Sequence, residues 1–154
     1  MPIDINGWIE YSPYTNEQER KEEYTWFTWM DVSSFIRFNV NVNWVIFGNP
    51  RDFQSELPDV IPIAKNRGLP NNLSYFPNLD VTEDIEYEKK NCNNEIFGFT
   101  HFYFSEIDRI DWLESYQIDI DKTEWGKLFA LTKEFQRLKK IQSNQIRFTV
   151  WYNW

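Results

Sequence analysis

The C-terminal stretch Ile146-Arg147-Phe148-Thr149-Val150-Trp151-Tyr152-Asn153 alternates between two sets of side chains along its whole length. Successive side chains of a β-strand point to opposite faces of the sheet, so this period of two predicts a strand with one buried face. The set expected to face the core is Ile146, Phe148, Val150 and Tyr152, and the opposite set is Arg147, Thr149, Trp151 and Asn153.

The N-terminal segment 3–11 has the same period and predicts a second, half-buried strand. Its apolar face carries Ile3, Ile5 and Ile9, and its opposite face carries Asp4, Asn6, Trp8 and Glu10. Two aromatic stretches, 24–30 and 97–104, are also expected to form strands, because aromatic side chains pack well on a pleated surface.

The clearest helix is expected to begin at Asp121, where Glu124 completes a capping box, and to end at Ser143-Asn144. Its apolar face, at helical spacing, consists of Trp125, Leu128, Phe129, Phe135 and Leu138.

Shorter helices are expected from Thr82 to about Lys90 and from Ser105, with Asp108 as the boxed acid, through Leu113. Residues 13–23 are expected to form a charged loop or a short exposed helix, and residues 51–79 to be loop-rich. Because helices and strands segregate rather than alternate strictly, the sequence predicts a single α+β domain over 1–154, with helices packed on a largely antiparallel sheet.

Residues 33–47 carry two conflicting patterns. One pattern is that of a strand, because the apolar side chains of Ile36, Phe38, Val40, Val42, Trp44 and Ile46 alternate with Arg37, Asn39, Asn41 and Asn43. The other is that of a helix, because Phe35, Phe38, Val42 and Val45 lie at helical spacing after an N-cap at Asp31 or Ser33. Taken alone, periodicity and β-branching favour the strand.

The composition favours recognition over catalysis. The chain is 19% aromatic, has one histidine and one cysteine, and carries a net charge of −8. Tryptophan and tyrosine offer large rigid contact surfaces, whereas the acidic balance argues against binding a nucleic-acid backbone. Cys92 has no partner for a disulfide within the chain, and no segment has the length and apolarity of a signal peptide or a membrane span. We therefore expect a location in the cytoplasm of a bacterial host cell.

Several motifs, taken in order, resemble a family of phage and bacterial proteins. That family has a strand "G-x-D-I-x-G-x-x-E", a helix end "L-F-G-(x)-V-R", a turn "R-G-L-P-x-D-x-S", a "W-x-x-x-E-L" element and a closing strand "V-R-x-x-F-W-F-D-N". The counterparts here are Asp4 to Glu10, Val45 to Gly48 with Arg51, Arg67 to Pro70 with Ser74, Thr100 to Ile107, and Ile146 to Asn153. The resemblance implies a helix over residues 33–47 and a phage or mobile-element context, but no activity.

The resemblance does not extend to the histidines that some relatives carry. Asn6 stands at one such position and the apolar Phe97 and Phe99 at others, so His101 is left alone and no metal site is predicted. We expect His101 to be packed and hydrogen-bonded on its aromatic strand, because no nucleophile motif accompanies it.

Carboxylates are the abundant residues with catalytic potential. The pairs Asp108 with Asp111, and Asp4 with Glu10, make a two-carboxylate hydrolase an alternative hypothesis. Carboxylates three residues apart on a short helix are more often its solvated face, so we predict no catalytic residues and no cofactor.

A ligand platform is predicted on the polar-facing side of the first and last strands. If these strands pair, Trp8 and Trp151 come together with Glu10 and Arg147; alternatively, helices cover this face and both indoles belong to the core. Tyr103 is a further stacking candidate. Arg67, in a Gly-Pro turn, either grips an anion or holds its own loop by bonding carbonyl groups.

These features predict a non-catalytic binding protein that modulates host defence, either by sequestering a nucleotide-like signal or by blocking a host protein. The alternative is an acidic immunity protein or antitoxin that neutralises a basic toxin. The aromatic content, including Trp8, Trp151 and Trp154, also predicts a homo-oligomer, most simply a C2 dimer.

Overall fold

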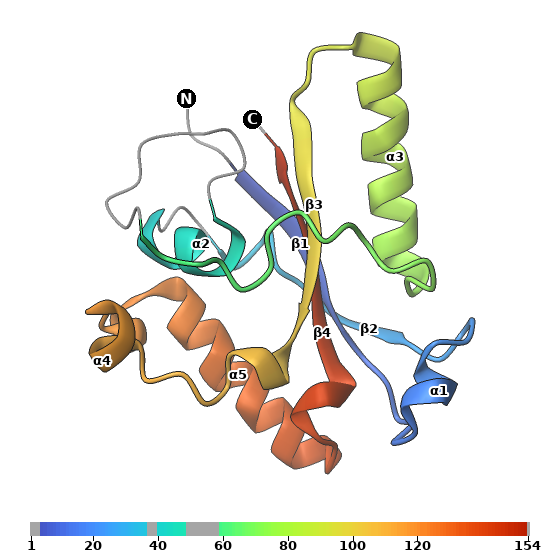
Figure 1. The fold of residues 1–154 in the computed structure, drawn as a ribbon. Coiled ribbons are helices and arrows are strands. Elements are labelled where there is room, and N and C mark those ends of the chain that lie inside the picture. Colours follow the sequence, from blue (N-terminus) through green and yellow to red (C-terminus); the bar gives the residue numbers. More distant parts are fainter. Residues whose placement is uncertain (1–3, 37–39, 49–58, 154) are drawn as a thin grey trace.

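A four-stranded antiparallel sheet forms the centre of the structure, a computed structural model that describes residues 4–36, 40–48 and 59–153. The strands are β1 (Asp4–Tyr11), β2 (Phe27–Asp31), β3 (Ile96–Tyr103) and β4 (Ile146–Asn153), in the order β2-β1-β4-β3. The first and last strands therefore lie side by side in the middle (Figure 1). The predicted α+β fold with a largely antiparallel sheet is confirmed.

The register of β1 on β4 joins the polar faces of both strands. Trp8 lies opposite Thr149, Asn6 opposite Trp151, and Glu10 opposite Arg147. Gly7 permits this close pairing, because a Cβ atom there would lie 2.4 Å from the carbonyl oxygen of Thr149.

The main core lies between one face of the sheet and three helices: α2 (Val40–Phe47), α4 (Trp112–Tyr116) and α5 (Glu124–Lys139). The alternate residues Ile146, Phe148, Val150 and Tyr152 of β4 are buried in this core, as the period of two predicts. Phe148 stacks on Phe102 of β3 with ring centroids 4.7 Å apart.

The opposite face of the sheet is covered in part by one long helix, α3 (Tyr75–Asn91) (Figure 1), and in part by Trp26 and the turn that contains Asn72 and Ser74. Only Pro77 and Val81 of α3 are buried. Val81 belongs to a second, smaller apolar cluster with Ile96 and Trp151, against which Phe99 packs. Far less apolar surface holds α3 to the sheet than holds α5.

A β-bulge in β3 directs its aromatic side chains to both faces of the sheet. The register shifts between Phe97 and Thr100, where Gly98 adopts a positive φ of 70°. Phe97 therefore stacks on Tyr152 above the main core, while Phe99 stacks on Trp151 under α3.

The helix expected over residues 33–47 is confirmed for α2, and the strand that periodicity alone favours is wrong there. The alternating asparagines favour a strand on the expectation that they face solvent. Asn43 is instead buried and accepts a hydrogen bond of 2.8 Å from the Trp125 indole. A polar residue on the core side thus gives a helix the pattern of a strand. Phe38 lies outside the described residues.

Three helix starts differ from the sequence-based expectations. The helix α3 begins at Tyr75 rather than Thr82, because Pro77 lies in its first turn, where no helical hydrogen bond from its nitrogen is needed. The N-cap of α5 is Thr123, whose hydroxyl accepts from the Gly126 N–H, rather than Asp121.

Asp111, rather than Ser105, caps the helix α4, and a 3₁₀ turn, η1 (Phe104–Glu106), precedes it. Two further 3₁₀ turns, η2 (Ile120–Lys122) and η3 (Ser143–Gln145), precede α5 and β4. The charged segment near the N-terminus contains the short helix α1 (Glu17–Arg20). None of the helices in the described ranges has the length and apolarity to cross a bilayer.

Candidate functional site

A buried ion pair joins the two central strands where the ligand platform was predicted. The Arg147 Nε donates to Glu10 Oε1 at 2.8 Å, and the side chains are 2% and 0% exposed. Register alone brings the pair together, because Glu10 and Arg147 lie directly opposite each other on β1 and β4. Two charges buried this deeply require further hydrogen bonds.

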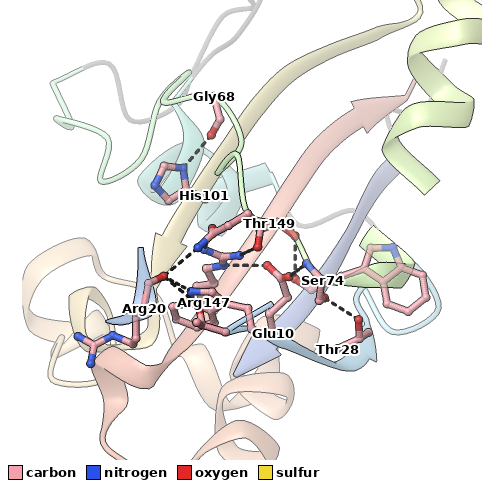
Figure 2. Close-up of polar contacts among 12 residues, drawn as sticks. Glu10, Arg20, Thr28, Gly68, Ser74, His101, Arg147 and Thr149 are labelled. Atoms are coloured by element: carbon pink, nitrogen blue, oxygen red, sulfur yellow. Dashed lines mark hydrogen bonds and ion pairs between the residues drawn. The ribbon is translucent and has the colours of Figure 1, made fainter. Parts of the chain in front are cut away.

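The turn that follows Arg67 supplies these hydrogen bonds (Figure 2). Arg147 donates from Nη1 to Asn72 Oδ1 at 2.9 Å and from Nη2 to the Asn72 carbonyl at 3.1 Å. The Ser74 backbone N–H donates to Glu10 Oε2 at 2.6 Å, and its hydroxyl bonds that of Thr28 on β2 at 2.6 Å.

The segment between α1 and β2 closes the network from the other side. The Arg147 guanidinium lies 4.0 Å from the centroid of the Trp26 ring. The Trp26 indole and the Asn72 amide both donate to the Arg20 carbonyl, each at 2.8 Å. Every nitrogen of the Arg147 guanidinium and both carboxylate oxygens of Glu10 therefore have partners within the chain.

The two platform tryptophans share one face of the sheet, as predicted, but α3 covers them. The Trp8 indole donates to Asp80 Oδ2 at 2.8 Å, and the Trp151 indole donates to Asp84 Oδ2 at 2.6 Å. Trp151 is 1% exposed. The structure thus matches the alternative in which helices cover this face, and it leaves Trp151 no free surface for stacking a ligand.

Arg67 holds its own loop, which is the second of the two roles weighed for it. It pairs with both carboxylate oxygens of Glu106, at 2.8 and 2.9 Å, and donates to the Ile63 carbonyl. Burial alone would raise the pKa of Glu106, but the hydrogen bonds from Arg67 and from the Tyr103 N–H lower it below its usual value. An incoming anion would have to displace this carboxylate.

Tyr103 and His101 lie on β3, where Tyr103 is directly opposite Arg147 of β4 and its ring centroid lies 6.3 Å from that of Trp26, and His101 is opposite Thr149. Tyr103 is partly buried and lines a hollow with Arg20, Ser105 and other polar residues. The His101 Nδ1 lies 2.7 Å from the Gly68 carbonyl, which only accepts, so Nδ1 carries the proton (Figure 2). His101 is thus packed and hydrogen-bonded, as expected.

The carboxylates weighed for hydrolysis have other contacts. Glu10 is bound to Arg147 rather than to Asp4, and the Asp111 carboxylate accepts from the Glu114 N–H as the cap of α4. Throughout the described ranges, no group of three or more histidine, cysteine or acidic side chains is placed to hold a metal ion.

Sequence reasoning found Glu10 and Arg147 but missed the residues that complete their network. Asn72 and Ser74 follow the Gly-Pro turn, and Asn72 stands where the resembled motif has aspartate. The motifs of the first strand, the turn and the last strand converge on this one network, so their spacing is explained by a shared structural role.

The covering helix α3 carries acidic side chains in an unusual density. From Tyr75 to Glu88 its sequence contains five carboxylates and neither lysine nor arginine. Burial raises the pKa of Asp80; the hydrogen bond from Trp8 opposes this shift, and the like charges of Asp84, Asp31 and Glu83 add to it. The carboxylates of Asp84 and Glu83, and that of Asp31 of β2, therefore lie close enough to Asp80 to repel its charge.

No protein-family model, no curated protein and no solved structure matches this chain. The resemblance to phage and bacterial proteins therefore stays a prediction.

Proposed function

We propose that this chain is a non-catalytic binding protein that neutralises a basic protein by occupying its surface. The observation that carries the proposal is the negative field of α3, where five carboxylates from residues 75–88 are accompanied by no cationic side chain. Together with the net charge of −8, such a field accelerates encounter with a positive partner and disfavours nucleic acids and acidic proteins.

Two kinds of basic partner are compatible with this proposal. In a phage or mobile element, the partner is a host defence protein; in a bacterial toxin locus, it is a toxin neutralised by its immunity protein. The neighbouring genes distinguish these cases, because a toxin domain directly upstream supports the second and phage genes on both sides support the first.

Sequestration of a nucleotide-like signal receives less support. Of the six residues predicted to hold such a ligand, Glu10, Arg147 and Trp151 are buried and bonded within the chain, and Arg67 is paired with Glu106. A ligand would have to break these contacts and compensate for their loss. Trp8 and Tyr103 retain partial exposure.

The test uses the product of the neighbouring gene, titrated against the purified chain at low and high salt. We expect binding that weakens as salt rises, because exposed charges more than a Debye length of ~10 Å apart are screened at 0.1 M. Binding that is insensitive to salt would contradict the proposal. Thermal stabilisation by nucleotides or cyclic dinucleotides would favour sequestration, and turnover of a phosphodiester or glycoside panel would favour the hydrolase.

A further inference from the structure

The side of α3 that points away from the sheet carries large apolar side chains. At ~100° per residue of an α-helix, they fall within about one third of its circumference, together with two glutamates. We call these six residues the α3 outer face: Tyr75, Phe76, Leu79, Glu83, Glu86 and Tyr87. All six are exposed, Tyr75 to 72% and Tyr87 to 50%.

Two aromatic residues of this face, Tyr75 and Phe76, make ring contacts. Phe76 stacks on Trp8 with centroids 6.0 Å apart, and Tyr75 meets Phe76 edge to face at 5.2 Å. Their remaining surface is exposed to solvent. Clustered exposed apolar side chains on a soluble surface usually mark a protein interface, and tyrosine is among the residues enriched at interface hot spots.

The charges on and beside this face determine which partner fits it. Glu83 and Glu86 lie between the apolar side chains, and Asp80 and Asp84 lie on the flank nearer the sheet. Lys89 and Lys90 occur only in the last turn of the helix, where they complement its dipole. A partner that covers residues 75–87 of α3 therefore encounters apolar groups, carboxylates and the neutral side chains of Asn78 and Thr82, but no lysine or arginine of that stretch.

We propose that the α3 outer face is the docking surface for a basic amphipathic segment of a partner protein. Apolar side chains of that segment pack on Tyr75, Leu79 and Tyr87, and its lysines or arginines pair with Glu83 and Glu86. This inference rests on the proposed function and adds the surface and the chemistry of the segment it binds. A second copy of this chain is disfavoured there, because it would bring the same negative charges together.

The experiment measures binding of fluorescent synthetic peptides to the whole chain. The probe is a helical peptide with lysines on one face and leucines on the other. Two companions replace its leucines with serine or its lysines with glutamate. We expect the basic amphipathic peptide to bind most tightly, and its resonance shifts in protein NMR spectra to map onto α3.

Two variants test the surface, and one serves as a matched control. Glu83→Gln with Glu86→Gln removes charge, and Tyr75→Ala with Leu79→Ala removes apolar anchors. Each is expected to weaken binding about tenfold or more, the scale of a lost hot spot. Leu131→Ala with Leu138→Ala removes exposed leucines from α5 and is expected to leave binding unchanged. All six positions are exposed, so urea denaturation should show an unchanged fold.

The outcomes separate this inference from the proposed function. Binding of the basic peptide that persists in both α3 variants, or shifts that map onto α5, overturns the docking surface but leaves a basic partner intact. Absence of binding by every basic peptide overturns both. Preference for the acidic peptide, or a dimer of the chain that excludes the peptide, also overturns the inference.

Discussion

At position 147, a guanidinium meets Glu10, Asn72 and the ring of Trp26, which come from three separate segments. Arg147 is 2% exposed, so its role is structural. If one of its partners were removed, its positive charge would stay buried without full compensation. The position looks like a ligand-binding arginine in the sequence because it lies on the polar face of its strand.

Removing one partner of this ion pair should destabilise the protein strongly. We expect Glu10→Gln to lower the free energy of unfolding by about 3–5 kcal/mol, because Arg147 would stay buried without its counter-charge. The matched control is Glu134→Gln, which breaks the exposed pair with Arg137 and should change stability by less than about 1 kcal/mol. Urea denaturation followed by tryptophan fluorescence measures both. Equal effects of the two substitutions would contradict a structural role for Glu10.

The contribution of Asp80 to the free energy of unfolding should change with pH in the opposite sense to that of a salt-bridged acid. Its pKa is raised in the folded protein by burial, so ionised Asp80 destabilises the fold at neutral pH and this penalty disappears as the pH falls through the raised pKa. Asp80→Asn keeps an acceptor for Trp8 and should stabilise the protein at pH 7 by about 0.5 kcal/mol.

The gain from Asp80→Asn should vanish well below the ordinary aspartate pKa of about 3.9, where the carboxyl group is neutral in both states. Glu86→Gln, on the exposed side of the same helix, is the control for a general loss of negative charge. Unfolding midpoints at the two pH values test this. Destabilisation by Asp80→Asn at pH 7 would mean that the charged hydrogen bond to Trp8 outweighs the burial.

Of the two long helices, α3 and α5, α3 buries fewer residues. It buries two residues, and its main polar ties to the sheet are the indole hydrogen bonds of Trp8 and Trp151. Sparse burial predicts opening that does not require global unfolding. We expect the amides of α3 to exchange with solvent faster than those of α5, whose inner face packs on the main core.

Removing one of these indole hydrogen bonds should accelerate amide exchange in α3 and not in α5. Asp84→Ala leaves the Trp151 indole without an acceptor, which costs about 1–3 kcal/mol when the group stays buried, or roughly 5- to 150-fold in the opening equilibrium. Asp84→Asn retains an acceptor and is the control. Hydrogen exchange measured by mass spectrometry should show faster exchange in α3 and no change in α5. Uniform acceleration in both helices would contradict independent opening.

The sequence predicts those helices and strands whose pattern is contained within their own residues. All four strands and the long helix α5 are predicted from local signals: β1, β4 and α5 from their periodicity, and β2 and β3 from their aromatic composition. Periodicity gives the wrong prediction at Asn43, because its burial depends on Trp125, a residue distant in sequence. It also does not predict the β-bulge at Gly98 in β3. The network around Arg147 is predicted only in part for the same reason. Pairing of the first and last strands predicts that Glu10 lies beside Arg147, whereas no local pattern places Asn72 or Ser74 there.

At the scale of the whole molecule, charge should control self-association as well as partner binding. The predicted homo-oligomer stays a prediction. If copies meet through the α3 outer face, their like charges oppose, so the oligomer should strengthen as salt rises, whereas binding to a basic partner should weaken. Light scattering at tens of micromolar, at low and high salt, measures the mass. A monomer at every salt concentration would contradict the predicted oligomer.

The most direct test of the central claim is site-specific photocrosslinking in bacterial cells that contain the partner. A photoreactive phenylalanine analogue is placed at Tyr75 or Tyr87 on α3, or at Leu138 on α5 as the control. The account predicts adducts from both α3 positions with one basic protein, lost when Glu83→Gln and Glu86→Gln are added. Adducts from the α5 position alone, or α3 adducts with an acidic protein that persist without these glutamates, would contradict it.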